Sequence, residues 1–333
     1  MHDRKPHPEL NKSRIVKALP KACAVELSAV EFFEAQRWGK EPRCVHCGEK
    51  DVYKMTDREG ARNKRFLWRC RVCGEQYTVR IGTIYEDSRL PLRHWAYAFW
   101  KACSSKKGVS ARQIQRECQI TYKSALFLMH RIRWAMHDDT TDAPKLGGEG
   151  RACEVDETYC GGKPRPASEE PPQPPRRRRY RTNPNKTPVV AMLERGGTVR
   201  TTIVPSVTQW NLRHFLAANI AAGTVLNTDS SPVYNTLPLP IGRHDVVNHT
   251  KHEYWRRNAD GTASGVNHCE SFFSLLKRGL MGTFHAVSRE HLFRYCDEFS
   301  FRWNTRRLND GQRIALAIRN SLGKRLVYAD AKC

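Results

Sequence analysis

The feature that most constrains how this chain can fold is a pair of Cys-x-x-Cys motifs, separated by 22 residues. The four cysteines are Cys44, Cys47, Cys70 and Cys73. Four thiolates close the tetrahedral site that zinc prefers, and a glycine after each pair, Gly48 or Gly74, suits the left-handed turn of a metal-binding knuckle. Strand-like residues at 65–79 indicate a ribbon rather than a finger. We therefore predict one structural Zn²⁺ with no open coordination position, against the alternatives of redox cysteines or buried thiols.

The chain of 333 residues carries a formal net charge of +23, from 57 basic and 34 acidic side chains. A surplus of this size repels itself in a folded protein, so a polyanionic partner is indicated, and nucleic acid is the first candidate. A solvated basic surface is the alternative. Five cations surround the cysteine pairs and add to this expectation: Arg43, Lys64, Arg65, Arg69 and Arg71.

The other eight of the 12 cysteines are scattered, which does not suggest a disulfide framework. No run of about 18 apolar residues occurs, so no membrane span is expected. We therefore expect a reducing, cytoplasmic setting.

Changes in pattern divide the chain into four parts. We predict a basic, loose arm over 1–27, then a helix and the ribbon over 28–90, where Ser28 and Glu31 form a capping box. A helical region follows over 91–140, and strands alternating with helices over 148–320 indicate an α/β domain. Within that domain, residues 163–188 are rich in Pro and Arg and are expected to form an exposed insertion.

Two predicted helices with a short break between them, over 110–133, suggest a helix-turn-helix. Ser110 and Thr121 are the expected N-caps, with Gln113 completing a capping box at the first. The expected core residues are Ile114, Cys118, Leu126 and Met129, and the candidate DNA-binding residues are Arg112, Arg116, Lys123, Arg131 and Arg133. An ordinary helical hairpin with solvated basic residues is the alternative.

Three carboxylates stand out by their positions. Asp156 lies within the first strand after the helical region, Asp229 ends an apolar strand, and Glu270 lies near the start of a helix. Phosphodiester transfer uses carboxylates to hold two Mg²⁺ or Mn²⁺ ions about 4 Å apart, and hard oxygen ligands suit those ions. Glu154 and Glu157 are expected to point to the face opposite Asp156. Taken singly, each such residue is more often a cap or turn residue.

Four stretches together resemble the DDE transposases of bacterial insertion sequences that carry an N-terminal zinc ribbon. They are CVHCG…CRVCGEQYTVRIGTIYEDSRLPLRHW, EVDETYCGGK, VLNTDSSPVY and VNHCESFFSLLKRGLMGTFHAVSREHL, and they cover most of residues 44–304. The resemblance implies a ribonuclease-H-like mixed sheet with helices, in which Asp156, Asp229 and Glu270 bind the metals and Lys277 assists. It also implies a nucleoid-associated bacterial protein with the element's terminal inverted repeats as substrate. Cutting both ends together requires at least a dimer.

Two residues near Glu270 are alternative candidates for the third metal ligand. The family varies at this position, where Asn or His occurs, and Asn267 and His268 lie just before Glu270. On a helix, Glu270 and Lys277 fall about 20° apart beside the apolar stripe, Asn267 lies about 60° away, and His268 points off that edge. We therefore favour Glu270. Two other functions stay open: a DNA-binding regulator derived from a transposase, and a nuclease that hydrolyses DNA without strand transfer.

Overall fold

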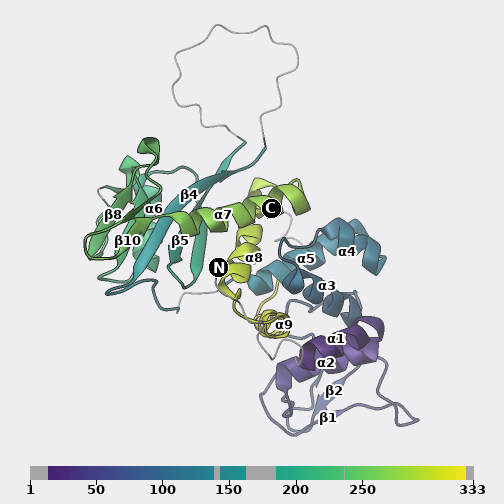
Figure 1. Ribbon diagram of the computed structural model, residues 1–333. Coiled ribbons are helices and arrows are strands. Elements are labelled where there is room, and N and C mark those ends of the chain that lie inside the picture. Colours follow the sequence, from purple (N-terminus) through teal and green to yellow (C-terminus); the bar gives the residue numbers. More distant parts are fainter. Residues whose placement is uncertain (1–13, 139–142, 163–184, 236, 328–333) are drawn as a thin grey trace, which may run out of the picture. The chain divides into compact units, whose positions relative to one another are not determined.

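A computed structural model describes residues 14–138, 143–162, 185–235 and 237–327 of the chain. These residues form two compact units, the first made of 14–138 and 305–327 and the second of the described residues between them (Figure 1). No helix of the described residues is long and apolar enough to cross a membrane.

The first unit is a group of helices with a small sheet attached. Its helices are α1 (Arg14–Ala24), α2 (Glu26–Trp38), α3 (Leu92–Ser104), α4 (Ala111–Cys118), α5 (Tyr122–Met136) and α9 (Asp310–Arg319). Although α9 follows the second unit in the chain, it packs against α1, α2, α3 and α5. Arg313 of α9 donates to the Cys103 carbonyl at 3.0 Å, and Lys324 donates to the His137 carbonyl at 2.6 Å. Residues 305–320, which the sequence boundaries placed in the catalytic domain, thus pack in the first unit.

The start of the chain differs from the prediction. Residues 1–13 lie outside the described part, but α1 is a helix where we expected a loose arm, because it buries Leu19 and Ala22. The predicted capping box at Ser28 is also wrong. Helix α2 begins at Glu26 without a side-chain cap, and the Glu26 carboxylate instead accepts the Leu92 amide at 2.7 Å, at the start of α3.

The small sheet is antiparallel, in the order β1-β2-β3. Its strands are β1 (Val52–Lys54), β2 (Trp68–Cys70) and β3 (Gln76–Tyr77). Phe66, which we expected to be part of a strand, has a φ of 57° and lies outside β2. Buried Glu34 of α2 joins the sheet to the helices, because its carboxylate accepts the Trp68 indole N–H at 2.7 Å and pairs with Arg62.

Helices α4 and α5 begin where the sequence predicts. The hydroxyl of Ser110 accepts the Gln113 amide and that of Thr121 accepts the Ser124 amide, which satisfies an otherwise unpaired N–H in each first turn. Gln119, between the helices, has a φ of 54° and allows the chain to turn. Of the predicted core residues, Ile114, Cys118 and Met129 are buried and Leu126 is half-buried.

The second unit contains a five-stranded sheet in the order β6-β5-β4-β7-β8. The strands are β4 (Ala152–Cys160), β5 (Thr187–Glu194), β6 (Val199–Ile203), β7 (Val225–Asp229) and β8 (Arg243–Val247). Strands β4, β5 and β6 pair antiparallel, whereas β7 runs parallel to β4 and β8 parallel to β7. Residues 163–184 of the predicted insertion lie outside the described part, and its last two residues, Thr187 and Pro188, open β5.

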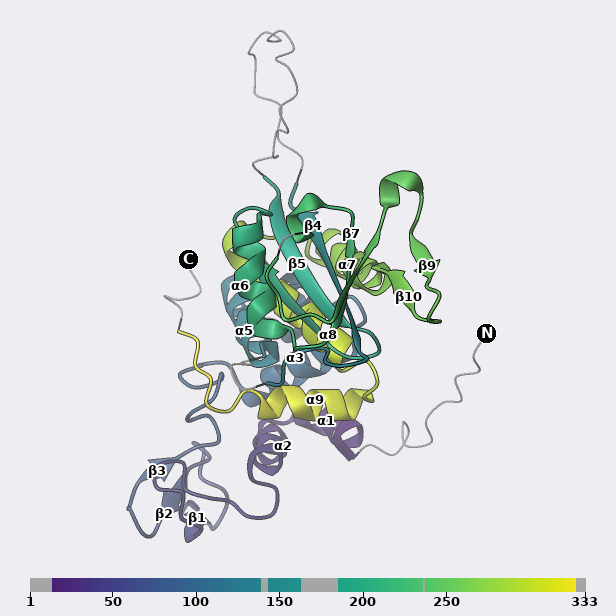
Figure 2. The same cartoon turned by 90° about the vertical axis from the view of Figure 1, so that its left-hand side faces the viewer.

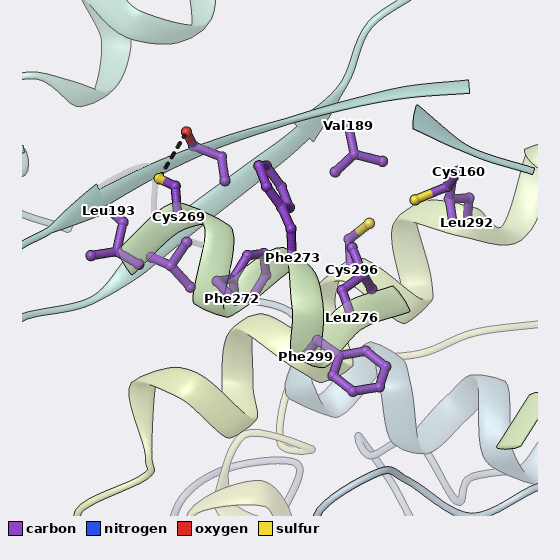
Figure 3. Packing of buried hydrophobic residues seen from close by; sticks show 12 residues of the cluster. Cys160, Val189, Leu193, Cys269, Phe272, Phe273, Leu276, Leu292, Cys296 and Phe299 are labelled. Carbon is purple, nitrogen blue, oxygen red and sulfur yellow. Dashed lines mark hydrogen bonds between the residues drawn. The ribbon is translucent and has the colours of Figure 1, made fainter. Parts of the chain in front are cut away.

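Helices cover both faces of this sheet. They are α6 (Gln209–Asn219), α7 (Asn267–Gly279) and α8 (Leu292–Asn304), and short turns at Pro232–Tyr234, His249–Lys251, Leu280–Phe284 and Arg289–His291 complete the unit. Alternate residues of β5 face opposite sides: Val190 and Met192 pack with α6, while Val189, Ala191 and Leu193 pack with α7 and α8. Figure 3 shows the second of these clusters, where the Cys269 thiol of α7 points at a carbonyl of β5, that of Ala191.

A two-stranded hairpin, β9 (Trp255–Arg257) and β10 (Ala263–Gly265), lies between β8 and α7 in the chain. It projects beside the sheet next to the start of α7 (Figure 2). The sequence analysis did not predict these strands.

Candidate functional site

The four cysteines of the two pairs converge at one end of the small sheet. Their sulfurs all lie within 4.8 Å of one another, with Sγ–Sγ distances of 3.6 Å for Cys44–Cys73 and for Cys47–Cys70. A tetrahedron with zinc–sulfur bonds of about 2.3 Å has edges of about 3.7 Å, so this spacing fits zinc. Gly48 and Gly74 have φ values of 81° and 76°, the left-handed turns predicted for the knuckles. The geometry supports a structural zinc ion here.

Asp156 and Asp229 lie on adjacent strands. The parallel register pairs Glu154 with Asn227, and two further residues along each strand place Asp156 level with Asp229. Asp229 ends β7, where its carboxylate accepts the Ser231 amide at 3.0 Å.

Glu270 enters from the first turn of α7, over the same sheet face as Asp156. Its side chain is 45% exposed and lies 3.9 Å from the His249 imidazole Nδ1. Two turns later, Lys277 is also exposed, and its charge moderates the raised pKa of the Cys160 thiol, which burial dominates. Lys277 therefore lies near the end of β4, on the side of the sheet that Asp156 faces.

The carboxylates near Asp156 affect its protonation through their negative charges. Burial raises the pKa of Asp156 to about 7, and the negative charges of Glu157, Asp229 and Glu270 add to this effect. Three segments far apart in sequence thus place their carboxylates around Asp156. They do not bring three oxygens within the 4.8 Å that marks the cysteine cluster, which is the sole such group among the described residues.

We expected Glu154 to point to the face opposite Asp156, but it lies on the same face of β4. Residues two apart share a strand face, and buried Glu154 lies under α7, where its carboxylate accepts the amides of His268 at 2.8 Å and Cys269 at 3.2 Å. Those amides are unpaired donors of the first turn, so Glu154 fixes where α7 begins. The His268 imidazole also contacts Glu154, at 2.8 Å.

Arg195, which the sequence analysis did not single out, also binds the Glu154 carboxylate. Its guanidinium contacts Glu154 at 2.7 Å, the Asn227 side chain at 3.2 Å and the Gly265 carbonyl at 2.8 Å. The start of α7, strand β7 and the hairpin are thereby tied to one buried carboxylate. No local signal marks Arg195, because it follows β5 in an ordinary Gly-Gly turn.

Glu157 faces the other side of β4, as predicted. It accepts a hydrogen bond from the Tyr234 hydroxyl, whose ring is buried in the turn after Asp229. Burial raises the pKa of Glu157, the Tyr234 hydrogen bond opposes this, and the charge of Asp229 adds to it. The pair joins the strand of Asp156 to the segment that follows Asp229.

The cations predicted to bind DNA divide into two groups. Arg112, Arg116 and Lys123 are exposed, and Arg112 stacks over the Tyr122 ring at 4.1 Å. Arg131 and Arg133 are 4% and 1% exposed, and Arg131 donates to the Leu326 carbonyl at 2.9 Å, inside the first unit. These two side chains therefore do not form a DNA surface. All five cations around the cysteine pairs are exposed.

Comparisons with known proteins agree with this arrangement. Residues 145–304 match the family model of the ISXO2-like transposase domain, and residues 25–76 match that of a transposase zinc-ribbon domain. A protein of Halobacterium salinarum, described as an uncharacterized protein in transposable element ISH50, is 27% identical over 292 residues, which cover 85% of this chain and 92% of that protein. The first match ends where the second unit ends, at residue 304. The chain is thus similar to insertion-sequence transposases with an N-terminal zinc ribbon, which confirms the predicted resemblance.

Proposed function

We propose that this chain, which is similar to insertion-sequence transposases with an N-terminal zinc ribbon, cleaves and joins DNA strands at Asp156, Asp229 and Glu270. The observation that carries the proposal is that Asp229 and Glu270, from a second strand and a helix, lie close enough to half-buried Asp156 for their charges to add to the effect of burial, which raises its pKa to about 7.

The sheet supports a ribonuclease-H-like fold. Three antiparallel strands continue into two parallel ones, with helices on both faces. Asp156 lies on the central strand and Asp229 at the carboxyl end of its parallel neighbour, an edge where α/β sheets place their sites.

A cluster of carboxylates suits Mg²⁺ or Mn²⁺, because hard oxygen ligands match these ions and their charge relieves the mutual repulsion. When bound, two such ions activate the attacking water or 3′-hydroxyl and stabilise the leaving oxygen.

The chain's own residues orient the reaction. Asp156 and Asp229 hold one side of the site, and Glu270 approaches from α7 because Glu154 fixes the start of that helix. Lys277 lies two turns along the same helix face, where its ammonium is placed to contact a DNA phosphate.

DNA binding is assigned to the first unit. We propose that α4 and α5 act as a helix-turn-helix through Arg112, Arg116 and Lys123, with the exposed cations of the ribbon contacting phosphates. The DNA is the terminal inverted repeats of the element and its target, and the chain acts as a homo-oligomer that holds both ends.

The experiment uses a plasmid that carries the reading frame's flanking DNA, with purified full-length protein in Mg²⁺. Asp156→Ala and Asp229→Ala should abolish cleavage and strand transfer but retain end binding. Glu270→Gln should lower activity by orders of magnitude and Asn267→Ala only modestly, and the reverse ranking would move the ligand to Asn267. Near-normal cleavage by the Asp156 or Asp229 variant would refute the assignment. Binding without any cleavage by the wild type would favour a regulator, and cleavage without joining a nuclease.

A further inference from the structure

The hairpin before α7 presents two aromatic side chains to solvent. Tyr254 and Trp255 are 50% and 54% exposed, although rings of this size are usually covered in a folded protein. Their exposure calls for a ligand with a flat, apolar face.

The Tyr254 ring lies next to the proposed catalytic edge, and Trp255 lies by the start of the helix that carries Glu270. The Tyr254 ring is 5.2 Å, centroid to centroid, from the His249 ring, and His249 lies 3.9 Å from the Glu270 carboxylate. Trp255 lines a pocket of about 190 Å³ with Asn267 and His268, at the start of α7.

The hairpin is held in place by polar contacts. At its tip, Asn258 donates to Asp245 of β8 at 3.3 Å, and Asp260 pairs with Arg243. At its base, Arg195 donates to the Gly265 carbonyl at 2.8 Å. Gly265 lies opposite Trp255, and a Cβ there would meet the indole Cδ1 at 3.5 Å and the Tyr254 carbonyl oxygen at 3.1 Å, so the bare glycine leaves room for the indole. The aromatic side chains are therefore presented on a fixed support, which lowers the entropic cost of binding.

The charge around these rings is positive. Arg257 and Lys251 are exposed on either side of them, whereas Arg256 is paired with Glu253 at 2.8 Å. Exposed rings beside cations, next to a site for DNA strand cleavage, match the chemistry of single-stranded DNA, whose bases stack on aromatic faces and whose phosphates need cations.

We propose that Tyr254 and Trp255 form a stacking platform for unpaired bases of the DNA strand at the cleavage site, with Arg257 and Lys251 contacting its phosphates. The platform would hold the strand end after the duplex opens beside Asp156 and Glu270. It rests on the proposed function, because it needs DNA at this edge.

The test measures affinity of the zinc-loaded, Mg²⁺-free protein for a labelled duplex with a five-nucleotide dT overhang and for the same duplex with a blunt end. The wild type should prefer the overhang, and Trp255→Ala should weaken overhang binding roughly tenfold while leaving blunt-end binding unchanged. Trp255→Phe should retain the preference. Trp210→Ala is the matched control, because Trp210 is 68% exposed on α6, which covers the other face of the sheet.

A second readout does not depend on affinity. With 5-iodouracil in the overhang, irradiation should cross-link the strand to Tyr254 or Trp255. Overhang binding by Trp255→Ala equal to wild type, an equal loss in Trp210→Ala, or cross-links only outside residues 249–257 would overturn the platform. Those results would leave the carboxylate assignment standing. Normal cleavage by Asp156→Ala, together with a Trp255-dependent overhang preference, would instead refute the proposed site while leaving the binding of unpaired bases by the hairpin standing.

Discussion

The raised pKa of Asp156 makes a quantitative prediction for Asp156→Asn in protein that holds zinc but no Mg²⁺. A carboxyl whose pKa rises from 3.8 to about 7 on folding binds more protons in the folded than in the unfolded state. The contribution of Asp156 to folding stability is therefore greatest at acid pH and is lost as pH rises from the unfolded to the folded pKa. At about 1.4 kcal/mol per pKa unit, the full loss is about 4 kcal/mol. About 2 kcal/mol of it falls between roughly pH 5.5 and 8.5.

The assay is urea denaturation of both proteins at the two pH values, with Mg²⁺ added in a parallel series. Asparagine has no charge to bury, so the variant should gain about 2 kcal/mol on the wild type between the two pH values, while other titrations cancel in the difference. Mg²⁺ should then stabilise the wild type at pH 8.5 and have little effect on the variant. Parallel pH profiles for the two proteins would show that folding does not raise the pKa of Asp156 and would refute the reasoning.

Two further predictions concern the zinc site and the core. Cys70→Ser should lose the single zinc in elemental analysis, and residues 40–80 but not the second unit should lose their protection from hydrogen exchange. The control variant Cys23→Ser lies outside the cluster and should keep the metal. Equal zinc in both variants would contradict the S4 site. Gly279→Ala should destabilise the protein by about 1–3 kcal/mol in denaturation, because its Cβ would lie 2.0 Å from the Phe299 ring. Gly282→Ala meets nothing within 4 Å and should cost far less; similar losses would mean that the contact between α7 and α8 is not tight.

Local signals explain what could be predicted. A cap residue before an apolar period located α4 and α5 to the residue, and an apolar run ending in Asp229 located β7. The cysteine spacing predicted the metal cluster, because two short motifs need only a turn between them to converge.

Tertiary contacts explain what could not be predicted. Helix α1 contains Pro20, which is unfavourable inside a helix and argues against one in the sequence. The helix is stabilised by burying Leu19 and Ala22 rather than by the helix propensity of its residues. Helix α9 joins the first unit only because the chain returns there after the second. Arg131 and Arg133 look like surface cations in sequence, but α5 is buried on all sides from Leu128 to Arg133.

Glu154 shows why the third ligand depends on an unpredicted residue. The helix that carries Glu270 has no side-chain cap of its own, and its first amides are satisfied by a carboxylate from β4, two residues from Asp156. One strand therefore supplies both a proposed metal ligand and the anchor that sets the distance to another. Through Arg195 the same carboxylate holds Gly265, and with it the base of the hairpin that bears Trp255. The proposed catalytic edge and the proposed stacking platform are thus positioned by one buried charge, which binding to Arg195 and to the helix N-terminus compensates.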